Sequence, residues 1–381
     1  MQKNTLVKLL SVFILAVSFT ATAAAPESDG DTPKDTKAEI KEYIQHHLQD
    51  SHDFNLFAST DEETGEVHHY GFPLPVIFWD DGKLHTFMSS EFHHGETAVE
   101  SNGNYYKLYH SKIYRVGEDG ALNYDAEHGD HPTDKVFLDL SITKSVVMML
   151  VTGLLLIWLF RSLAKSYAKN RSIPAGIGRF FEPIVLYIRD DIAIANIGEK
   201  KYKRYMPFLL TVFFFIWFLN MFGLTPLGVN VTGNIAVTTA LALLVFLLTN
   251  FTGTKDYWKH IFDPLGDGMP WIGKIFIYII LVPIEILGMF IKPFALLIRL
   301  YANMTAGHVV LMSLIGLIFI FKSWIGGPLS FGLSFAISLI EVLVALLQAY
   351  IFTMLAALYF GFAAEEHDHG HEEHEGELQH L

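Results

Sequence analysis

Long apolar runs dominate the chain after about residue 140, and each is long enough to cross a lipid bilayer. A span needs about 20 apolar residues, and helices satisfy their own backbone hydrogen bonds inside hydrocarbon. Two of the runs, 271–321 and 329–362, exceed one upright span. The first contains Pro283 and Pro293, so a kinked or strongly tilted helix with one net crossing is expected there. The pattern predicts an all-α polytopic membrane domain over residues 141–364.

Three shorter runs, 142–160, 207–224 and 233–251, bring the predicted total to five net crossings. Residues 225–232 and Gly326-Gly327-Pro328 are expected to be turns, the former an external one. Between the first two spans, residues 174–200 place apolar side chains at helical spacing among charges, which is typical of an amphipathic helix along the membrane interface.

Basic residues set the predicted orientation. They follow the first run and flank the second and third; the set comprises Arg161, Lys165, Lys169, Arg171, Lys200, Lys201, Lys203, Arg204, Lys255 and Lys259. Lys and Arg gather in cytoplasmic loops. The N-terminus is therefore predicted outside and the C-terminus inside.

The first 25 residues resemble a secretory signal peptide. Lys3 and Lys8 precede a short apolar run, and small residues at 21–25 offer a cleavage site. The run is shorter than a span, which favours cleavage over an uncleaved anchor helix.

Residues 26–140 form the second predicted part, a small extracytoplasmic α+β region. Thr36 and Glu39 have the spacing of a capping box before a short amphipathic helix. Strands at 72–79 and 84–88 flank Asp80-Asp81-Gly82, which predicts a hairpin, and 105–116 is strand-rich. The chain has no cysteine, so disulfides and thiolate metal sites are excluded, and its net charge of −13 argues against a nucleic-acid partner.

Histidines are concentrated in this region and in the acidic tail at 365–381, which is expected to be disordered. The pairs are His46-His47, His68-His69 and His93-His94. Neighbouring side chains on a helix or strand point apart, so a polar surface is favoured over a metal site. No bound cofactor is predicted.

Arg299 lies among apolar residues in the middle of the longest run, where an arginine costs roughly 2.5–3.5 kcal/mol. Asn303 is one turn away and can orient it. Glu285, fourteen residues earlier, is on the order of 20 Å distant along an ideal helix. The counter-charge is therefore expected on another span, with Glu341 as a structural ion pair, or on another protein. Lys292 can extend its charge to the interface.

His308 and Glu341 form a second candidate pair, and Gln348 shares a helix face with Glu341 two turns away. An imidazole titrates near neutrality, and a carboxylate can tune it, so these residues can line a hydrated path from the outer surface. Glu285 can serve a separate path to the inside. Arg299 and His308 are nine residues apart and so lie on opposite faces of an ideal helix. A break near Gly307 or polar groups from neighbouring helices are needed to connect them.

The run Lys292-Pro-Phe-Ala-Leu-Leu-Ile-Arg299-Leu-Tyr-Ala-Asn303-Met-Thr-Ala-Gly307-His308 resembles the signature of subunit a of F-type ATP synthases. The stretch from Glu341 to Phe352 resembles the final helix of that family, and Asn220, Pro226 and 234–239 resemble its preceding hairpin more weakly. The resemblance covers residues 140–364, and leaves the N-terminal region and the tail unexplained.

The resemblance implies roles for particular residues. Arg299 matches the essential arginine of the family; Asn303, His308, Glu341 and Gln348 match the outer half-channel, and Glu285 matches the inner one. Many bacterial members carry the acid and the histidine of the pair the other way round. An exchange keeps one acid and one imidazole in the path.

The resemblance further implies a bacterial inner-membrane subunit that is not an enzyme on its own. Its partners are expected to be a ring of c subunits, b-type peripheral stalk subunits and the rest of the ATP synthase. The transported ion is expected to be a proton, with a sodium-translocating variant as the alternative. Two further hypotheses are a His-rich metal transporter and a structural anchor whose intramembrane charges are packing pairs.

Overall fold

The computed structural model describes Ile44 and residues 48–60, 67–124, 132–136, 138–169, 176, 178–225, 229–263, 271–320 and 326–365, without the side chains of 56–60, 67–69, 271–276 and 319. The chain divides into two compact units. The first holds Met1–Ile173, Phe214–Thr238 and Arg299–Ala349; the second holds Pro174–Phe213, Thr239–Ile298 and Tyr350–Leu381. The predicted signal peptide, the capping box at Thr36 and the His-rich tail lie outside the described residues.

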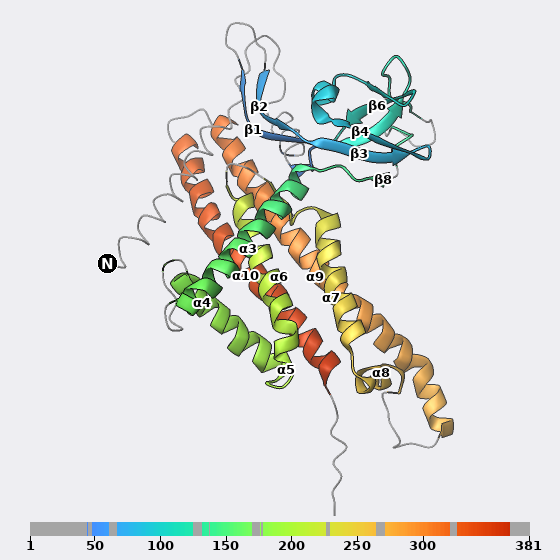
Figure 1. The fold of residues 1–381 in the computed structure, drawn as a ribbon, viewed down its shortest axis with the longest axis vertical. Helices are drawn as coiled ribbons and strands as arrows, with labels where there is room; N and C mark the ends of the chain where they lie inside the picture. The colour runs from blue at the N-terminus through green and yellow to red at the C-terminus, as the bar shows by residue number, and fades with distance from the viewer. Residues whose placement is uncertain are drawn as a thin grey trace, which may run out of the picture. The chain divides into compact units, whose positions relative to one another are not determined.

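The first unit begins with a β-rich part, called here the N-terminal module (residues 48–141). Its strands are β1 (Asp53–Thr60), β2 (Val67–Pro73), β3 (Pro75–Asp80), β4 (Lys83–Met88), β5 (Val99–Ser101), β6 (Asn104–Tyr109), β7 (Lys112–Val116) and β8 (Leu138–Asp139), with the 3₁₀ helix η1 (Ser89–Gly95) after β4. They form three antiparallel sheets, β1-β2, β4-β3-β8 and β5-β6-β7 (Figure 1).

The predicted hairpin around Asp80-Asp81-Gly82 is present, formed by β3 and β4. Asp81 and Gly82 both have positive φ, 51° and 75°, as a two-residue hairpin turn that follows the twist of the strands requires. The strand-rich piece at 105–116 is also present, as the β6–β7 hairpin. The predicted strand at 72–79 is divided between β2 and β3 at Leu74, which is buried.

The hydrophobic core of the module contains buried residues from both hairpins. It consists of Val76, Phe78, Phe92, Val99, Tyr106, Ile113 and Val136. The Tyr106 hydroxyl donates to Asp80 at 2.8 Å. Burial together with this hydrogen bond raises the pKa of Tyr106 to about 12.

The module is joined to the helices of the first unit by hydrogen bonds and by apolar packing. Asp50 accepts hydrogen bonds from the Thr143 hydroxyl (2.8 Å), the Ser145 amide (3.1 Å) and the Asn234 side-chain amide (3.1 Å). One apolar cluster contains Phe54, Leu74, Met148, Leu219, Val229 and Val231. Within the expected external turn at 225–232, Val229, Val231 and Thr232 are buried, and the two valines pack against the module.

Among the residues that the structure describes, five helices are long and apolar enough to cross a membrane, in agreement with the five predicted crossings. They are α3 (Lys144–Lys169), α6 (Tyr202–Gly223), α7 (Ile235–Thr252), α9 (Trp271–Ile320) and α10 (Gly326–Ala364). The fold is thus a polytopic helical membrane protein with a small N-terminal α+β region (Figure 1).

One local prediction for the long helices was wrong, and one of the two alternatives considered for Gly307 is not realised. Gly326-Gly327-Pro328 is not a turn but the first turn of α10. Proline fits there because the first amides of a helix have no intrahelical acceptor. Gly307 does not break α9, which continues through Pro283, Pro293 and Gly307 as one helix of 50 residues.

The second unit contains the predicted amphipathic stretch as three consecutive helical segments, α4 (Gly178–Tyr187), the π-helix η2 (Ile188–Ile194) and α5 (Ala195–Ile197). A short helix, α8 (Lys255–Phe262), follows α7. The end of α10 is fixed by hydrogen bonds from Lys201 Nζ to Ala364 O (2.6 Å) and from Thr254 N to Ala363 O (2.9 Å). Gly361 allows the backbone of Asn196 to lie against α10, because an added Cβ would collide with the Asn196 carbonyl.

Candidate functional site

A group of buried polar side chains lies in the first unit, on the parts of α6, α9 and α10 that this unit contains. Asn220 comes from α6, Thr232 from the loop before α7, His308 from α9, and Glu341 and Gln348 from α10. All five are at most 8% exposed. Burying polar groups in an apolar helix bundle is costly unless they are paired or hydrated, so this cluster calls for an explanation.

His308 points toward α6. A Cβ added at Gly223 would lie 3.1 Å from His308 Nε2, so the imidazole packs against the α-carbon of Gly223. No described residue bonds to this buried Nε2 atom. His308 can therefore exchange a proton with a water molecule or another mobile donor at this edge of the ring.

Asn220 lies one turn before Gly223 on α6, and hence on the same side of that helix. Its Oδ1 accepts a hydrogen bond from the Thr232 hydroxyl at 2.6 Å, in a fully buried position. Its Nδ2, like the Oγ1 of Thr305 on α9, has no described partner. The donor group of this buried amide is therefore left without a partner among the described residues.

Glu341 lies against the backbone of α9 at Gly307. A Cβ added at Gly307 would be 2.5 Å from Glu341 Cδ and would collide with both carboxylate oxygens. Glu341 Oε2 is buried and has no described partner. The Glu341 carboxylate of α10 therefore contacts α9 at Gly307, the residue directly before His308. The sequence offered one signal for this role of Gly307, a glycine next to a histidine in an apolar helix.

Arg299 lies outside this buried cluster. Its side chain is exposed on α9, whereas its neighbours Leu296, Leu300 and Met304 are buried. No hydrogen bond or ion pair joins it to any residue that the structure describes, so the predicted alternative of an ion pair with Glu341 is wrong. Asn303 is exposed one turn further on and does not bond to it. His308 is buried, which confirms the expectation that its side chain and that of Arg299 take opposite faces.

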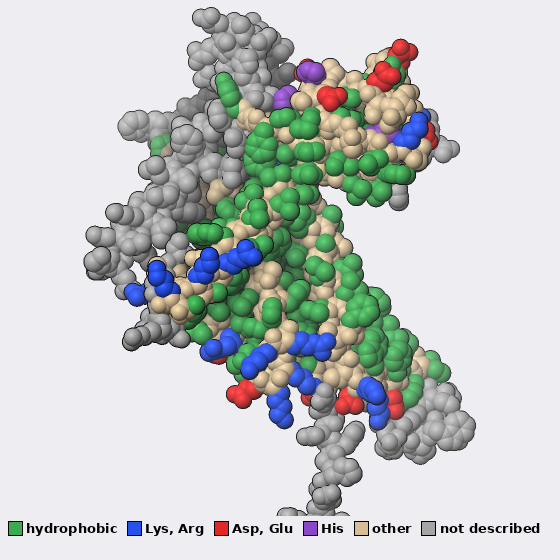
Figure 2. Space-filling model, viewed as in Figure 1, with side chains coloured by type: hydrophobic (Ala, Val, Ile, Leu, Met, Phe, Trp, Pro, Cys, Tyr) green, Lys and Arg blue, Asp and Glu red, His purple; other side chains and the backbone are tan. Residues whose placement is uncertain are grey.

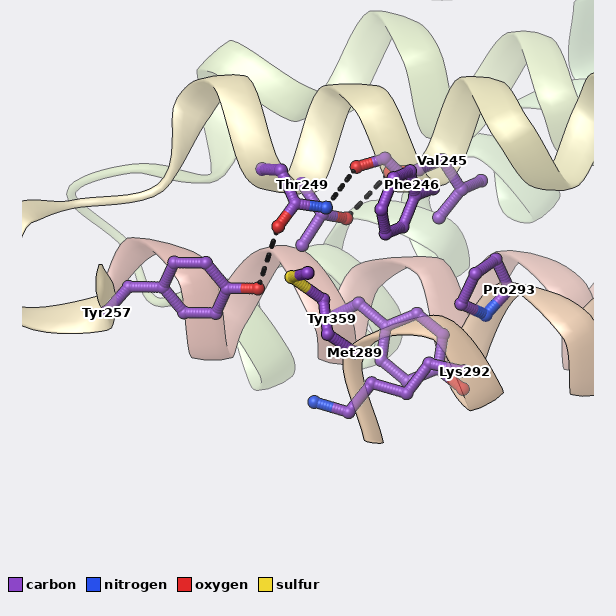
Figure 3. Close-up of a pocket in the computed structure, with 9 residues that line it drawn as sticks. Val245, Phe246, Thr249, Tyr257, Met289, Lys292, Pro293 and Tyr359 are labelled. Carbon is purple, nitrogen blue, oxygen red and sulfur yellow. Dashed lines mark hydrogen bonds between the residues drawn. The ribbon is translucent and has the colours of Figure 1, made fainter. Parts of the chain in front are cut away.

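Glu285 and Lys292 belong to the second unit. Glu285 is half-buried, and Lys292 is exposed with its Nζ 5.7 Å from the Tyr359 ring centroid and 5.5 Å from that of Phe362. Lys292 also lines a small pocket with Asn250 and Tyr257, in which the Tyr257 hydroxyl donates to Asn250 Oδ1 at 3.2 Å (Figure 3). The pocket offers about 20 Å³, room for roughly one water molecule and for no organic cofactor.

Several histidines of the N-terminal module make local contacts. His94 Nδ1 lies 3.2 Å from Asp53, and His93 Nδ1 lies 3.1 Å from the Thr97 hydroxyl. Within the described ranges no group of three or more histidine and carboxylate side chains is arranged to hold a metal ion. His46-His47, the side chains of His68-His69 and the tail lie outside those ranges.

Comparisons with known proteins match both parts of the chain. The family model for the ATP synthase A chain matches residues 146–361, and a model described as Domain of unknown function (DUF8433) matches residues 43–140. The first family model thus covers more than half of the chain, including every candidate residue above.

Several curated relatives carry the name ATP synthase subunit a. One from Chloroherpeton thalassium is 44% identical over 243 residues (62% of this chain, 70% of the relative), and one from Myxococcus xanthus is 45% identical over 258 residues (64% and 80%). A protein named ATP synthase subunit a 2 from Prosthecochloris aestuarii is 40% identical over 319 residues (81% and 94%), so that similarity extends into the N-terminal module. The chain belongs to the ATP synthase subunit a family, and is thus an ion-translocating membrane subunit of that complex and not an enzyme on its own.

Proposed function

We propose that this chain translocates protons, that it does so beside a ring of c subunits, and that Arg299 is the residue on which coupling depends. The observation that carries the proposal is the exposure of Arg299 on a membrane-spanning helix without any partner among the described residues. A guanidinium in that position costs several kcal/mol unless another molecule supplies a counter-charge. A carboxylate on a c subunit meets this requirement.

Arg299 acts by favouring the ionised form of that carboxylate, because an opposite charge in a low-dielectric environment stabilises the anion. A ring carboxylate that arrives protonated loses its proton near Arg299, and the ring can then rotate onward after protonation on the other side. The same positive charge opposes the direct passage of a proton between the two half-channels. Arginine suits this role better than lysine, which deprotonates more readily when desolvated.

The buried cluster of Asn220, His308, Glu341 and Gln348 is the proposed outer half-channel. Unpaired polar atoms on three different side chains support this role, since buried polar groups in proteins bond to water where protein partners are lacking. A proton passing from the outside protonates the imidazole or the carboxylate and then moves toward the ring. Asn303, exposed next to Arg299, lies where this path leaves α9. Glu285 serves the inner half-channel.

A proton fits this cluster better than a sodium ion. An alkali cation needs several converging oxygen atoms to replace its hydration shell. His308 contributes nitrogen instead, and the side-chain carbonyl oxygen of Asn220 already accepts a hydrogen bond from the Thr232 hydroxyl. ATP-driven uptake of protons in sodium-free medium supports the proposal, and an absolute requirement for sodium contradicts it.

The remaining parts of the proposal concern placement and assembly. The N-terminus and residues 26–140 lie outside the bacterial inner membrane after cleavage of residues 1–25, and the C-terminus with the tail 365–381 lies inside. Basic residues at the end of α3 and on α8, which follows α7, support this orientation. The membrane domain, 141–364, contacts the c ring and the b-type peripheral stalk.

The test is the variant Arg299→Ala in the assembled complex, with Arg161→Ala as its control. Arg161 is also an exposed arginine on a spanning helix, but it lies near the basic end of α3. Inverted membrane vesicles are assayed for ATP-driven acidification with a pH-sensitive dye, and the amount of inserted subunit is measured by immunoblotting. The expected result is loss of acidification in Arg299→Ala at a normal level of subunit, with normal acidification in the control.

Normal acidification by the Arg299→Ala variant would sink the proposed role. Arg299→Lys separates charge from geometry, because a lysine keeps the positive charge only while it stays protonated. Activity of that variant is expected to fall steeply as pH rises, whereas a role in packing alone predicts no such pH dependence.

A further inference from the structure

The sheet β4-β3-β8 of the N-terminal module has one face without any charged side chain. Strand residues alternate between the two faces of a sheet. In β3 and β4 the cross-strand pairs Ile77–Thr86, Trp79–Leu84 and Pro75–Met88 share one face, and Trp79 also pairs with Leu138 of β8. The apolar members of this face are Ile77, Trp79, Leu84, Met88, Leu138 and Leu140, called here the uncharged face.

The opposite face is of a different kind. It carries Val76 and Phe78 of the module core, together with Asp139, whose Oδ2 lies 3.1 Å from the buried His52 Nε2. The core therefore lies entirely on one side of the sheet. On the uncharged face Trp79, Leu84 and Leu138 remain 48%, 51% and 44% exposed (Figure 2 shows hydrophobic side chains gathered along these strands). A contiguous apolar surface of this kind marks a contact with another molecule or with a membrane.

The position of the uncharged face in the chain points to the membrane. β8 continues directly into the first spanning helix, since Leu140 precedes the start of α3 at Lys144 by four residues. The ladder also continues past β8, with hydrogen bonds from Leu140 N to Ile77 O (2.8 Å) and from Ile142 N to Pro75 O (3.0 Å). At about 3.3 Å per residue, Leu140 lies within roughly 13 Å of the first residue of the span. The sheet is therefore held close to the surface of the bilayer.

We propose that the uncharged face lies on the membrane surface and inserts its side chains into the interface between lipid headgroups and acyl chains. Its composition fits that environment, because Trp prefers the interface and Leu and Met gain from contact with acyl chains. A protein partner usually finds hydrogen-bonding groups and charges around an apolar centre, but the cross-strand pairs of this face offer only the Thr86 hydroxyl and the Trp79 indole N–H. The proposal needs only the membrane spans, and does not depend on the transported ion.

The experiment uses single-cysteine variants, which the absence of native cysteine makes possible. Leu84→Cys and Leu138→Cys probe the uncharged face, and Lys112→Cys, exposed on β7 in a different sheet, is the control. The full-length chain is reconstituted into phosphatidylcholine–phosphatidylglycerol vesicles, and a small environment-sensitive fluorophore is attached to the cysteine. Quenching is measured with aqueous iodide and with lipids brominated near the headgroup end of the acyl chain.

The proposal expects a blue-shifted emission at positions 84 and 138, strong quenching by brominated lipid and loss of most of the iodide quenching seen at position 112. Iodide quenching equal to that of the control, without quenching by brominated lipid, would overturn it. Protection from iodide without quenching by brominated lipid would overturn it as well. That outcome would assign the face to a protein surface, either a second copy if it depends on chain concentration or a segment of the same chain if it does not.

Discussion

The contact between Gly307 and Glu341 leads to a prediction that separates a functional carboxylate from a packing one. In Gly307→Ala the new Cβ would lie 2.5 Å from Glu341 Cδ, whereas carbon atoms in contact prefer about 3.5–4.0 Å. The carboxylate must therefore move by about 1–1.5 Å. It can do so easily, because it is the end of a flexible side chain, and the cost in folding stability should lie at the low end of the usual ~1–3 kcal/mol for an added methyl group, at about 1 kcal/mol.

The functional cost is expected to be larger than the cost in stability. Displacement of a reacting group by about 1 Å can reduce a rate by about 100-fold. ATP-driven proton uptake by inverted vesicles is therefore expected to fall by about 10- to 100-fold in Gly307→Ala, at an unchanged level of inserted subunit. Gly288→Ala on the same helix is the matched control, because nothing lies within 4 Å of a Cβ at that position.

A second substitution, at Glu341, is expected to compensate for the effect of Gly307→Ala. Glu341→Asp shortens the side chain by one methylene, about 1.5 Å, which is close to the displacement that the methyl group of Gly307→Ala would impose. The double variant Gly307→Ala/Glu341→Asp should therefore pump at least as well as Glu341→Asp alone. Two contacting residues of this kind are expected to show a coupling energy of roughly 0.5–3 kcal/mol. Simple additivity of the two losses would refute the reasoning, as would full activity of Gly307→Ala.

Three further predictions concern hydrogen bonds of the polar cluster and of the N-terminal module. Thr232→Val removes the buried hydrogen bond to Asn220 and leaves its Oδ1 without that donor, so thermal unfolding in detergent should show a loss of about 1–3 kcal/mol; Thr211→Val, exposed on α6, should show little change. Asp50→Ala removes three accepted hydrogen bonds and should increase amide exchange at the start of α3 and around Asn234, whereas unchanged exchange at both places would contradict the proposed docking. Burial alone would raise the pKa of Asp139, but hydrogen bonds from His52 and Ser141 outweigh burial and hold the pKa below its usual value. The stabilisation from Asp139 is therefore fully present above about pH 4, the unfolded pKa, and disappears as pH falls through the lower folded value; acid unfolding of the module followed by fluorescence should lose this component in Asp139→Asn.

The sequence predicted the membrane part well, because each signal there depends on the large free-energy cost of placing polar or charged groups in hydrocarbon. Charge is excluded from hydrocarbon, so the five apolar runs correspond to five helices, and Arg299 stands out as an exception from the sequence alone. The opposite placement of Arg299 and His308 also followed directly from helical geometry. Errors in this part were confined to a few residues at helix ends, such as the first turn of α10, where a proline is tolerated.

Contacts between segments distant in the chain could not be predicted in the same way. The burial of Val229 and Val231 depends on Phe54 and Leu74, more than 150 residues earlier. Likewise, the π-helix Ile188–Ile194 lies in a stretch whose apolar spacing was read as an ordinary amphipathic helix. The collision that a Cβ at residue 307 would meet depends on where α10 places Glu341. Each of these features depends on tertiary packing, which the local periodicity of the sequence does not report.

In the proposed mechanism, the single helix α9 borders both the proton path and the barrier that Arg299 forms. A proton path beside Arg299 would be electrostatically unfavourable, since a fixed guanidinium repels a proton in a low-dielectric environment. The unbroken helix places His308 about two and a half turns along α9 from Arg299, and hence on the opposite side of the helix axis, against Gly223 of α6. Glu341 contacts the same helix at Gly307. The polar cluster is therefore shielded from the arginine by the backbone of α9 itself. A proton that has passed the cluster must leave it around α9 to reach a ring carboxylate, and the exposed Asn303, one turn from Arg299 and five residues before His308, is the side chain best situated to assist that passage.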